Sequence, residues 1–138
     1  MNHSFSKCRS LGFVLAAVLA AVPVLSQADI YVIANSSLSV TPDDIRLIYT
    51  GDKELAGSVK VRALDNHTAQ SEFLTKVLQL NPNRYDALWT MKSFRDGLTP
   101  PVSKPSDAEV IAYVESTPGA IGYVTSAPPP GVVVVKKY

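Results

Sequence analysis

The sequence predicts an α/β, three-layer sandwich in which helices cover a small, largely parallel sheet. Two observations lead to this prediction. Short apolar segments typical of buried strands alternate along the chain with segments of helical periodicity. The clearest unit is the stretch 106–124, where a helix-like segment passes through Pro118 and Gly119 directly into an apolar strand ending at Val124.

Residues 1–28 have the composition of a secretory signal peptide. Lys7 and Arg9 form a basic start, an almost unbroken apolar run covers residues 11–25, and small residues precede the end of the segment at Ala28. The apolar run has about 15 residues, whereas a membrane-spanning helix needs about 20. We therefore expect cleavage after Ala28 rather than a membrane anchor, and no membrane span in the mature chain.

The mature chain, residues 29–138, is expected to form one domain. Loss of the leader leaves eleven basic residues against twelve acidic ones, because Lys7 and Arg9 are removed from a total of thirteen. This near-neutral balance, without basic runs, argues against nucleic acid as a partner. The only cysteine, Cys8, falls in the leader, and one histidine, His67, remains. Disulfides, thiol chemistry, a metal site and a cofactor are therefore not expected.

The first half of the mature chain predicts two strands and two helices. Residues 30–34 are apolar and indicate a buried strand. Thr41 is a suitable helix cap and Pro42 a suitable first helical residue, and Gly51 is expected to end that helix. After a polar connection come the remaining predicted elements: a strand over 59–64, a turn over 65–68, and a helix whose apolar stripe includes Phe73, Leu74, Val77 and Leu78.

The second half predicts two more helices and two more strands. Asn81 and Pro82 begin a helix that buries Tyr85, Leu88 and Trp89 and ends near Gly97. The later predicted elements are an extended loop over 99–105, a helix with a capping box over 106–116, a strand over 120–124, a rigid link over 128–131, and a last buried strand over 132–135 before a solvated end.

The turn 65–68 is the most promising place for ligand binding. A strand that ends at a helix N-terminus presents backbone N–H groups and a positive dipole end, which suit an anion. Asn66 and Thr68 add side-chain donors, and His67 is the only residue there that titrates near neutral pH. Ser36 and Ser37 would face this turn if both loops lie on the same sheet edge. Helix capping and a solvated histidine remain the structural alternatives for these residues.

The sequence does not indicate an enzyme. It has no G-x-S-x-G segment, and its serines and threonines stand in capping positions. Asp43 and Asp44 are adjacent on a predicted helix, so they point apart and are interpreted as first-turn acids. Tyr85 and Trp89 are one helical turn apart with Leu88 between them, which favours core packing over an aromatic ligand platform.

From about Ile30 to Val124, the chain resembles small, single-domain members of the phosphate ABC-transporter substrate-binding protein family, which are related to type II periplasmic binding proteins. The segments that carry this resemblance are 32–35, 44–51, 61–65, the helix with Phe73, the residues Tyr85, Trp89 and Gly97, and the blocks 110–114 and 117–124. The last block is the most specific, and the others occur in the family's order.

The resemblance implies a periplasmic location and a fold like one lobe of a type II binding protein. In the full-size proteins, two lobes clamp phosphate with helix N-termini and Ser/Thr hydroxyls. One of their loops is a Gly-Ser-Gly-Thr type turn, often followed by Arg. Here residues 66–70 take that place, without glycines and with Gln70 where Arg is expected, so Thr68 is the nearest hydroxyl.

These observations lead to a functional hypothesis with one alternative. The chain is expected to be a non-catalytic, periplasmic domain that binds phosphate or a related small oxyanion through Ser36, Ser37, Asn66, His67 and Thr68. Its expected partners are an ABC transporter or another envelope protein, and two copies could pair as a homodimer. The alternative is an accessory or protein-interaction domain that has lost phosphate binding, with the proline-rich segments 99–105 and 128–130 as contact surfaces.

Overall fold

A computed structural model describes residue 12 and residues 29–138. The predicted signal peptide therefore lies outside the described residues, apart from Gly12. The strands are β1 (Tyr31–Ala34), β2 (Leu55–Ala56), β3 (Val59–Lys60), β4 (Arg62–Asn66), β5 (Val102–Lys104), β6 (Ala120–Val124) and β7 (Val133–Lys137). The helices are α1 (Pro42–Tyr49), α2 (Gln70–Phe73), the π-helical segment η1 (Leu74–Leu78), α3 (Pro82–Asp96) and α4 (Asp107–Ser116).

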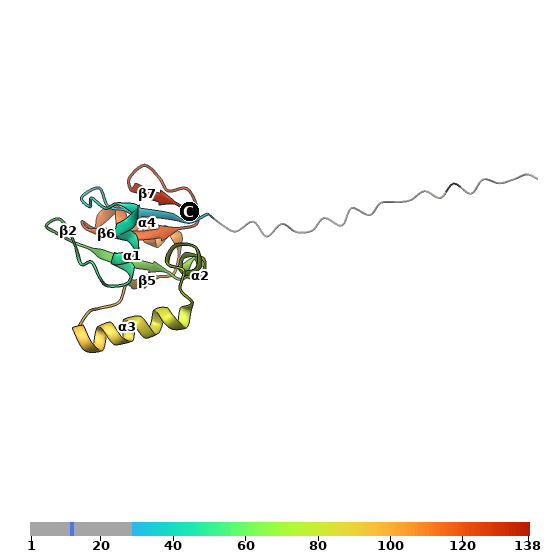
Figure 1. Ribbon diagram of the computed structural model, residues 1–138. Helices are drawn as coiled ribbons and strands as arrows, with labels where there is room; N and C mark the ends of the chain where they lie inside the picture. Colours follow the sequence, from blue (N-terminus) through green and yellow to red (C-terminus); the bar gives the residue numbers. More distant parts are fainter. Residues whose placement is uncertain (1–11, 13–28) are drawn as a thin grey trace, which may run out of the picture.

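The central feature is a five-stranded sheet with the strand order β5-β4-β6-β1-β7 (Figure 1). Strands β5, β4 and β6 are parallel to one another. Strand β1 is antiparallel to both β6 and β7. Four of the five strands in this sheet thus run in one direction, and β1 runs in the other. The largely parallel α/β fold predicted from the sequence is confirmed, with β1 as the reversed strand.

One face of the sheet is covered by α1 and by the segment formed by α2 and η1, and Tyr85 and Trp89 of α3 belong to the same hydrophobic core. Its central contacts are aromatic: the rings of Phe73 and Tyr123 stack with centroids 3.9 Å apart, and Tyr49 meets Phe73 edge-on at 4.7 Å. The Tyr49 hydroxyl donates to the carbonyl oxygen of Leu64 at 2.8 Å. These contacts join α1, α2 and β6 into one hydrophobic core.

The other face is covered by α4. Val110 and Val114 pack on a second apolar cluster that includes Ile33 of β1 and Val124 of β6. A Cβ atom on Gly122 would lie 2.6 Å from Val110 Cγ1, so the absence of a side chain in β6 allows α4 to approach the sheet. Helices therefore lie on both faces, which confirms the three-layer arrangement.

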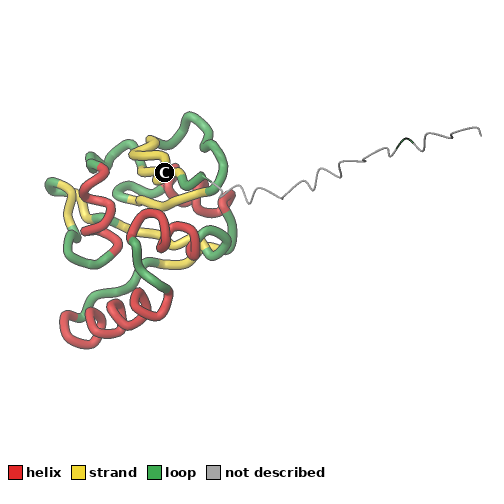
Figure 2. The backbone as a smooth tube through the Cα atoms, turned by 45° about the vertical axis from the view of Figure 1, so that its right-hand side comes forward, coloured by secondary structure: helices red, strands yellow, loops and turns green. Residues whose placement is uncertain are grey.

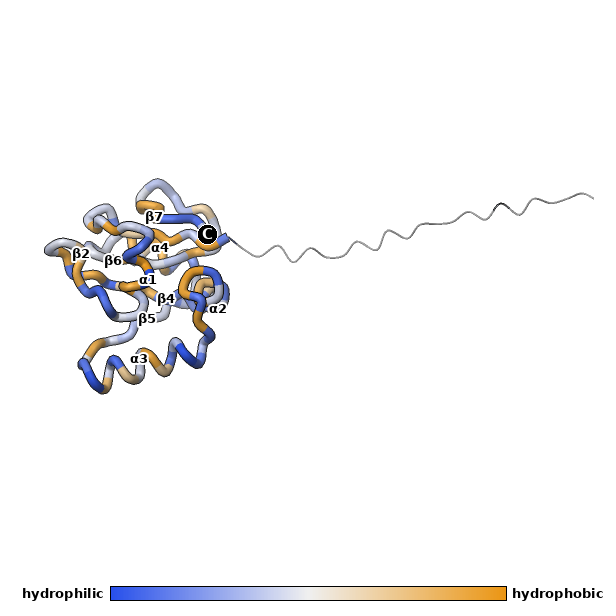
Figure 3. Tube along the Cα trace, in the orientation of Figure 1, coloured by the Kyte–Doolittle hydropathy of each residue, from blue (hydrophilic) through white to orange (hydrophobic). Residues whose placement is uncertain are grey.

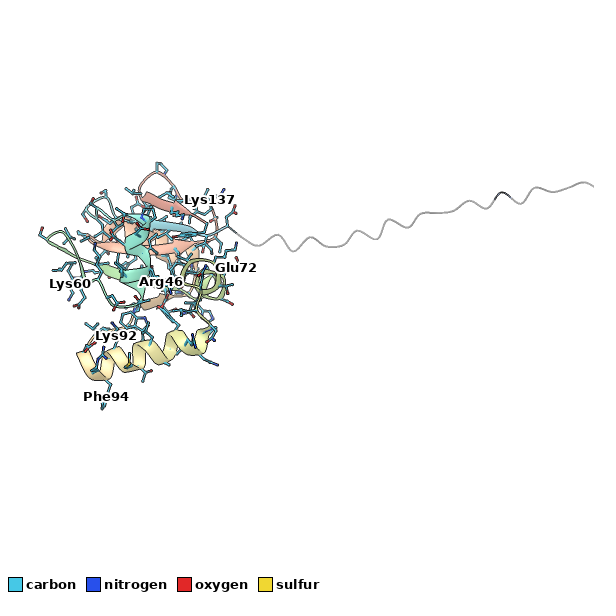
Figure 4. The ribbon with its side chains drawn as sticks, viewed as in Figure 1. Arg46, Lys60, Glu72, Lys92, Phe94 and Lys137 are labelled. Carbon is cyan, nitrogen blue, oxygen red and sulfur yellow. The ribbon has the colours of Figure 1, made fainter. Side chains whose placement is uncertain are left out.

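Helix α3 is set apart from the sheet, below the other elements in Figures 1 and 2. Its trace alternates between hydrophilic and hydrophobic colours in Figure 3. Only one side faces the domain, where Tyr85 and Trp89 are buried and Lys92 forms an ion pair of 2.6 Å with Asp52. On the opposite side Phe94 is 94% exposed and points away from the domain (Figure 4).

The helix boundaries agree with the sequence signals. Thr41 precedes α1, and its N–H donates to the Asp44 carboxylate at 2.9 Å. Asn81 caps α3 by accepting a hydrogen bond from the Arg84 N–H at 2.8 Å. Gly97 ends α3 with a φ of +68°. These helix ends were predicted because capping depends on residues close together in sequence.

Several strand predictions are corrected by the structure. The predicted strand 59–64 is two strands: β3 pairs with β2 in a hairpin, whereas β4 begins at Arg62 and continues through Asp65 and Asn66. Those last two residues are buried in the sheet rather than part of the turn, which comprises residues 67–69. Residues 102–104, predicted as loop, form β5 because they pair with the end of β4.

The last strand lies at an edge of the sheet rather than in its interior. Strand β7 pairs with β1 on one side only, and Val133 and Val134 are 47% and 46% exposed. Of the residues predicted for this buried strand, Val132 is buried. The run of valines indicates a strand correctly, but hydrophobicity does not distinguish an edge strand from a central one.

Candidate functional site

The end of β4 is organised by the side chain of Asn66, which is completely buried. Its amide nitrogen donates to an Asp107 carboxylate oxygen at 2.6 Å and to the Tyr123 carbonyl oxygen at 3.0 Å. Its amide oxygen accepts from the Thr68 N–H at 3.1 Å and from the Thr68 hydroxyl at 2.7 Å. Asn66 therefore links β4, β6, α4 and the turn, and its hydrogen-bonding capacity is used within the fold.

The carboxylate of Asp107 lies at the first residue of α4, beside this turn. Besides the Asn66 amide, it accepts from the Thr125 N–H at 3.1 Å, the Thr125 hydroxyl at 2.7 Å and the Ser126 hydroxyl at 3.3 Å. Burial alone would raise the pKa of Asp107, but the hydrogen bonds from Thr125 and Asn66 outweigh it and lower the pKa. An internal anion thus occupies the N-terminus of α4, where the helix dipole favours negative charge.

His67 and Thr68 are the exposed residues of the turn. The His67 N–H donates to the Lys104 carbonyl oxygen at 2.9 Å, which joins the turn to the end of β5. The next residues begin the helical segment formed by α2 and η1, residues 70–78. The first N–H groups of a helical segment have no acceptor within it, so those of Gln70 and Ser71 are directed out of its start. The turn therefore combines an exposed threonine, an exposed histidine and helix-start N–H groups.

Ser36 and Ser37 do not lie beside this turn. Because β1 runs opposite to β4, the loop after β1 comes to the other end of the sheet, where Ala34 pairs with Ile121 and Ala120 lies beside the start of β4. There the Ser37 hydroxyl accepts a hydrogen bond from the Gly119 N–H at 2.9 Å. The five predicted residues therefore do not form one site: Asn66, His67 and Thr68 are together, whereas Ser36 and Ser37 are apart.

The structure adds residues to the turn that were not among the predicted ligand residues. Asp107, Thr125 and Ser126 share one hydrogen-bonded cluster with Asn66. The sequence could have indicated that Thr125 and Ser126 lie at this site, because they directly follow the apolar strand 120–124. Carboxyl ends of neighbouring parallel strands meet at one sheet edge, so residues after β6 are brought to those after β4.

Lys104 is a cationic residue beside the turn, since its carbonyl oxygen accepts from the His67 N–H. Lys104 ends β5 opposite Asn66, and its Nζ lies 4.9 Å from the centre of the Tyr113 ring. Within residues 29–138, no group of three or more His, Cys, Asp or Glu side chains is arranged to hold a metal ion. In the same part of the chain, no helix combines the length and apolar character needed to cross a membrane. Chemically, the turn can donate hydrogen bonds to a small anion but supplies little compensating charge.

Comparisons with known proteins find similarity in structure. No protein-family model matches the sequence, and no curated protein matches it. An ABC-type phosphate transport receptor from Vibrio cholerae aligns with a TM-score of 0.50 and 15% identity, over 79% of this chain and 46% of the receptor. PstS from Borrelia burgdorferi aligns with a TM-score of 0.51 and 17% identity, over 70% of this chain and 41% of PstS.

At these identities the similarity concerns the fold. The chain spans less than half the length of the solved structures it matches. The sequence motifs indicated a resemblance to phosphate ABC-transporter substrate-binding proteins. This resemblance is confirmed for the fold. The described domain therefore has the α/β fold of part of a phosphate-transport receptor.

Proposed function

We propose that this chain is a non-catalytic binding domain for phosphate or a related small oxyanion. The observation that carries the proposal is the fold, which the chain shares with part of an ABC-type phosphate transport receptor and of PstS. The turn after β4 is the proposed site. Its exposed residues, His67 and Thr68, precede the start of a helical segment, and both are among the residues predicted from the sequence.

Binding through this turn is expected to be weak. Phosphate carries more than one negative charge near neutral pH, and the ionised Asp107 lies next to Asn66. The Thr68 hydroxyl proton, now donated to Asn66, must turn toward the anion. We therefore expect a dissociation constant of about 1 mM, which corresponds to about −4 kcal/mol.

Phosphate is expected to raise the thermal unfolding temperature, and Thr68→Ala is expected to reduce this effect. At about 20 mM phosphate, a dissociation constant of about 1 mM stabilises the folded state by about 1.8 kcal/mol, or about 7 °C for a domain of this size. Loss of the Thr68 hydroxyl should weaken binding about fivefold and reduce the shift to about 4 °C. Differential scanning fluorimetry at constant ionic strength measures both shifts.

Thr75→Ala is the matched control. Thr75 is also exposed and its hydroxyl donates to a backbone carbonyl, that of Ser71, at 3.0 Å, but it lies in η1 rather than in the turn. Non-specific stabilisation by phosphate would be equal in the two variants. Equal shifts for Thr68→Ala and Thr75→Ala would exclude the turn, and the absence of any shift would exclude phosphate and favour the protein-interaction hypothesis.

We also propose that residues 1–28 direct export to the periplasm and are removed there. The support is the basic start followed by an apolar run too short for a membrane span. Expression of the full chain in a Gram-negative host should yield a periplasmic protein that begins at Asp29, as measured by intact mass. Recovery of uncleaved chain in the membrane fraction would instead identify an anchor. Export would place the domain in the compartment where it can contact an ABC transporter or another envelope protein. The pairing of two copies of the chain remains a separate prediction.

A further inference from the structure

A cavity lies between the loop 97–101, which connects α3 to β5, and the start of β4. Its volume is about 320 Å³, within the range of small-molecule sites. Residues 62–64 of β4 line it from the sheet, and the β2–β3 hairpin contributes Lys60. The turn 67–69 follows the opposite end of β4. The oxyanion proposal for that turn therefore makes no use of this cavity.

One part of the cavity wall is apolar and accessible. Val61, Ala63 and Leu98 line the cavity and are half-buried. Val102, at the start of β5, also lines it and is 55% exposed. Two consecutive prolines, residues 100 and 101, belong to the same wall. Because proline fixes its own φ, they restrict the backbone of the loop and favour a preformed cavity.

Another part of the wall is positively charged. Lys60 and Arg62 both line the cavity and are exposed, and Figure 4 shows Lys60 on the side of the molecule where α3 ends. In the described part of the chain, neither side chain forms an ion pair, whereas Lys53 in the same wall is paired with Asp44 at 2.8 Å. Glu54 also lines the cavity, so the unpaired cations exceed the acidic charge. The cavity therefore favours an anion.

The end of α3 determines where a negative group would lie in this cavity. The helix ends at Asp96, and Gly97 and Leu98 after it line the cavity. The C-terminal end of a helix carries partial negative charge, which disfavours an anion. An anionic group is therefore favoured beside Lys60 and Arg62 rather than beside Leu98, where an apolar group is suitable.

We propose that this cavity binds a small carboxylic acid in its ionised form, with its carboxylate at Lys60 and Arg62 and its apolar body against Leu98 and Val102. The Arg62 guanidinium can donate two parallel hydrogen bonds to a carboxylate, and Lys60 adds a second positive charge. Burial of the apolar body removes the accessible surface of Leu98 and Val102 from water. An inorganic oxyanion gains nothing from those apolar side chains.

Titration with cyclohexanecarboxylate, followed by ¹H–¹⁵N NMR at constant ionic strength, tests this proposal. The amide signals of residues 61–64, Leu98 and Val102 should shift saturably, with a dissociation constant of about 1 mM. Cyclohexanecarboxamide keeps the ring without the charge, and acetate keeps the charge without the ring. Each should bind about tenfold more weakly, because each loses one of the two kinds of contact. Arg62→Gln and Lys60→Gln should each weaken cyclohexanecarboxylate binding about fivefold.

Arg84→Gln is the matched control, because Arg84 is also exposed but belongs to α3 and does not line the cavity. It should bind cyclohexanecarboxylate as the unmodified protein does. A lack of saturable shifts, equal binding of the neutral amide or of acetate, or equal affinity in Arg62→Gln, Lys60→Gln and Arg84→Gln would overturn the proposal. Phosphate should leave the signals of residues 61–64 unchanged, which keeps this result independent of oxyanion binding at the turn. A saturable phosphate shift there would instead identify a general anion site and contradict the proposal.

Discussion

Gly119→Ala is expected to destabilise the fold by about 2–5 kcal/mol, more than other single substitutions considered for this protein. Gly119 has a φ of +79°, which costs an L-residue with a side chain about 1–2 kcal/mol. A Cβ atom there would also overlap the Lys60 carbonyl oxygen, which belongs to the backbone and cannot turn away. Urea denaturation followed by circular dichroism measures the loss.

The turn at Gly119 is sensitive because it joins three segments. Its carbonyl oxygen accepts from the Arg62 N–H at 2.8 Å at the start of β4, and its N–H donates to Ser37 after β1 at 2.9 Å. Gly57→Ala is the matched control, because Gly57 has a φ of +62° but nothing within 4 Å of the added Cβ atom. It should lose about 1–2 kcal/mol. Equal losses for the two variants would contradict the proposed steric overlap.

Tyr85→Phe and Tyr123→Phe are each expected to destabilise the protein by about 1.5–3 kcal/mol at pH 7. Each substitution keeps the ring but removes a hydroxyl that donates to the Asp65 carboxylate. The carboxylate is buried, so water does not replace the lost donor. Chemical denaturation of each variant and of the unmodified protein at the same pH gives the difference.

The loss of stability in these two variants should be smaller at acid pH than at pH 7. The direction of this change follows from the titration of Asp65. Burial raises the folded-state pKa of Asp65 above its ordinary value of 3.8, and removal of a donor hydroxyl raises it further. The folded state therefore binds the proton more tightly than the unfolded state. The contribution of Asp65 to stability is fully present below pH 3.8 and is lost as the pH rises through the folded pKa. The variants lose the most free energy of unfolding where Asp65 is ionised. Their loss relative to the unmodified protein therefore becomes smaller as the pH falls from 7 toward 4.

Tyr49→Phe distinguishes this effect from the general loss of a buried hydroxyl. Tyr49 is fully buried like Tyr123, but its hydroxyl donates to the neutral Leu64 carbonyl oxygen. Removal of the Tyr49 hydroxyl should reduce the free energy of unfolding by about 1 kcal/mol, equally at pH 7 and at pH 4. A deficit in Tyr123→Phe that does not change with pH would show that Asp65 is not charged in the folded protein.

Local sequence signals predicted the helices well. The residues Thr41, Asn81 and Ser106 mark helix starts in the structure, because each forms a hydrogen bond with a residue only three positions away. The turn at Gly119 and the close packing at Gly122 were also predictable, since glycine is the residue that permits a positive φ or a close approach.

Strand pairing was harder to predict because it depends on residues far apart in sequence. The apolar segment 30–34 indicates a strand, but nothing in it shows that β1 runs opposite to β4. That reversal separates Ser36 and Ser37 from the turn at Thr68. Polar Asp65 was predicted to lie in a turn, and it is buried in β4 because two tyrosines from α3 and β6 donate to it. These partners lie 20 and 58 residues away.

The most direct test of oxyanion binding is a phosphate titration of the ¹⁵N-labelled protein followed by ¹H–¹⁵N NMR. The expected result is a progressive, saturable shift of the amide signals of residues 67–71, with a dissociation constant of about 1 mM. The signals of Ser36, Ser37 and Gly119 should not follow this curve, because β1 carries those serines to the other end of the sheet. Amide signals of residues 67–71 that stay unchanged up to high phosphate would contradict the proposed function.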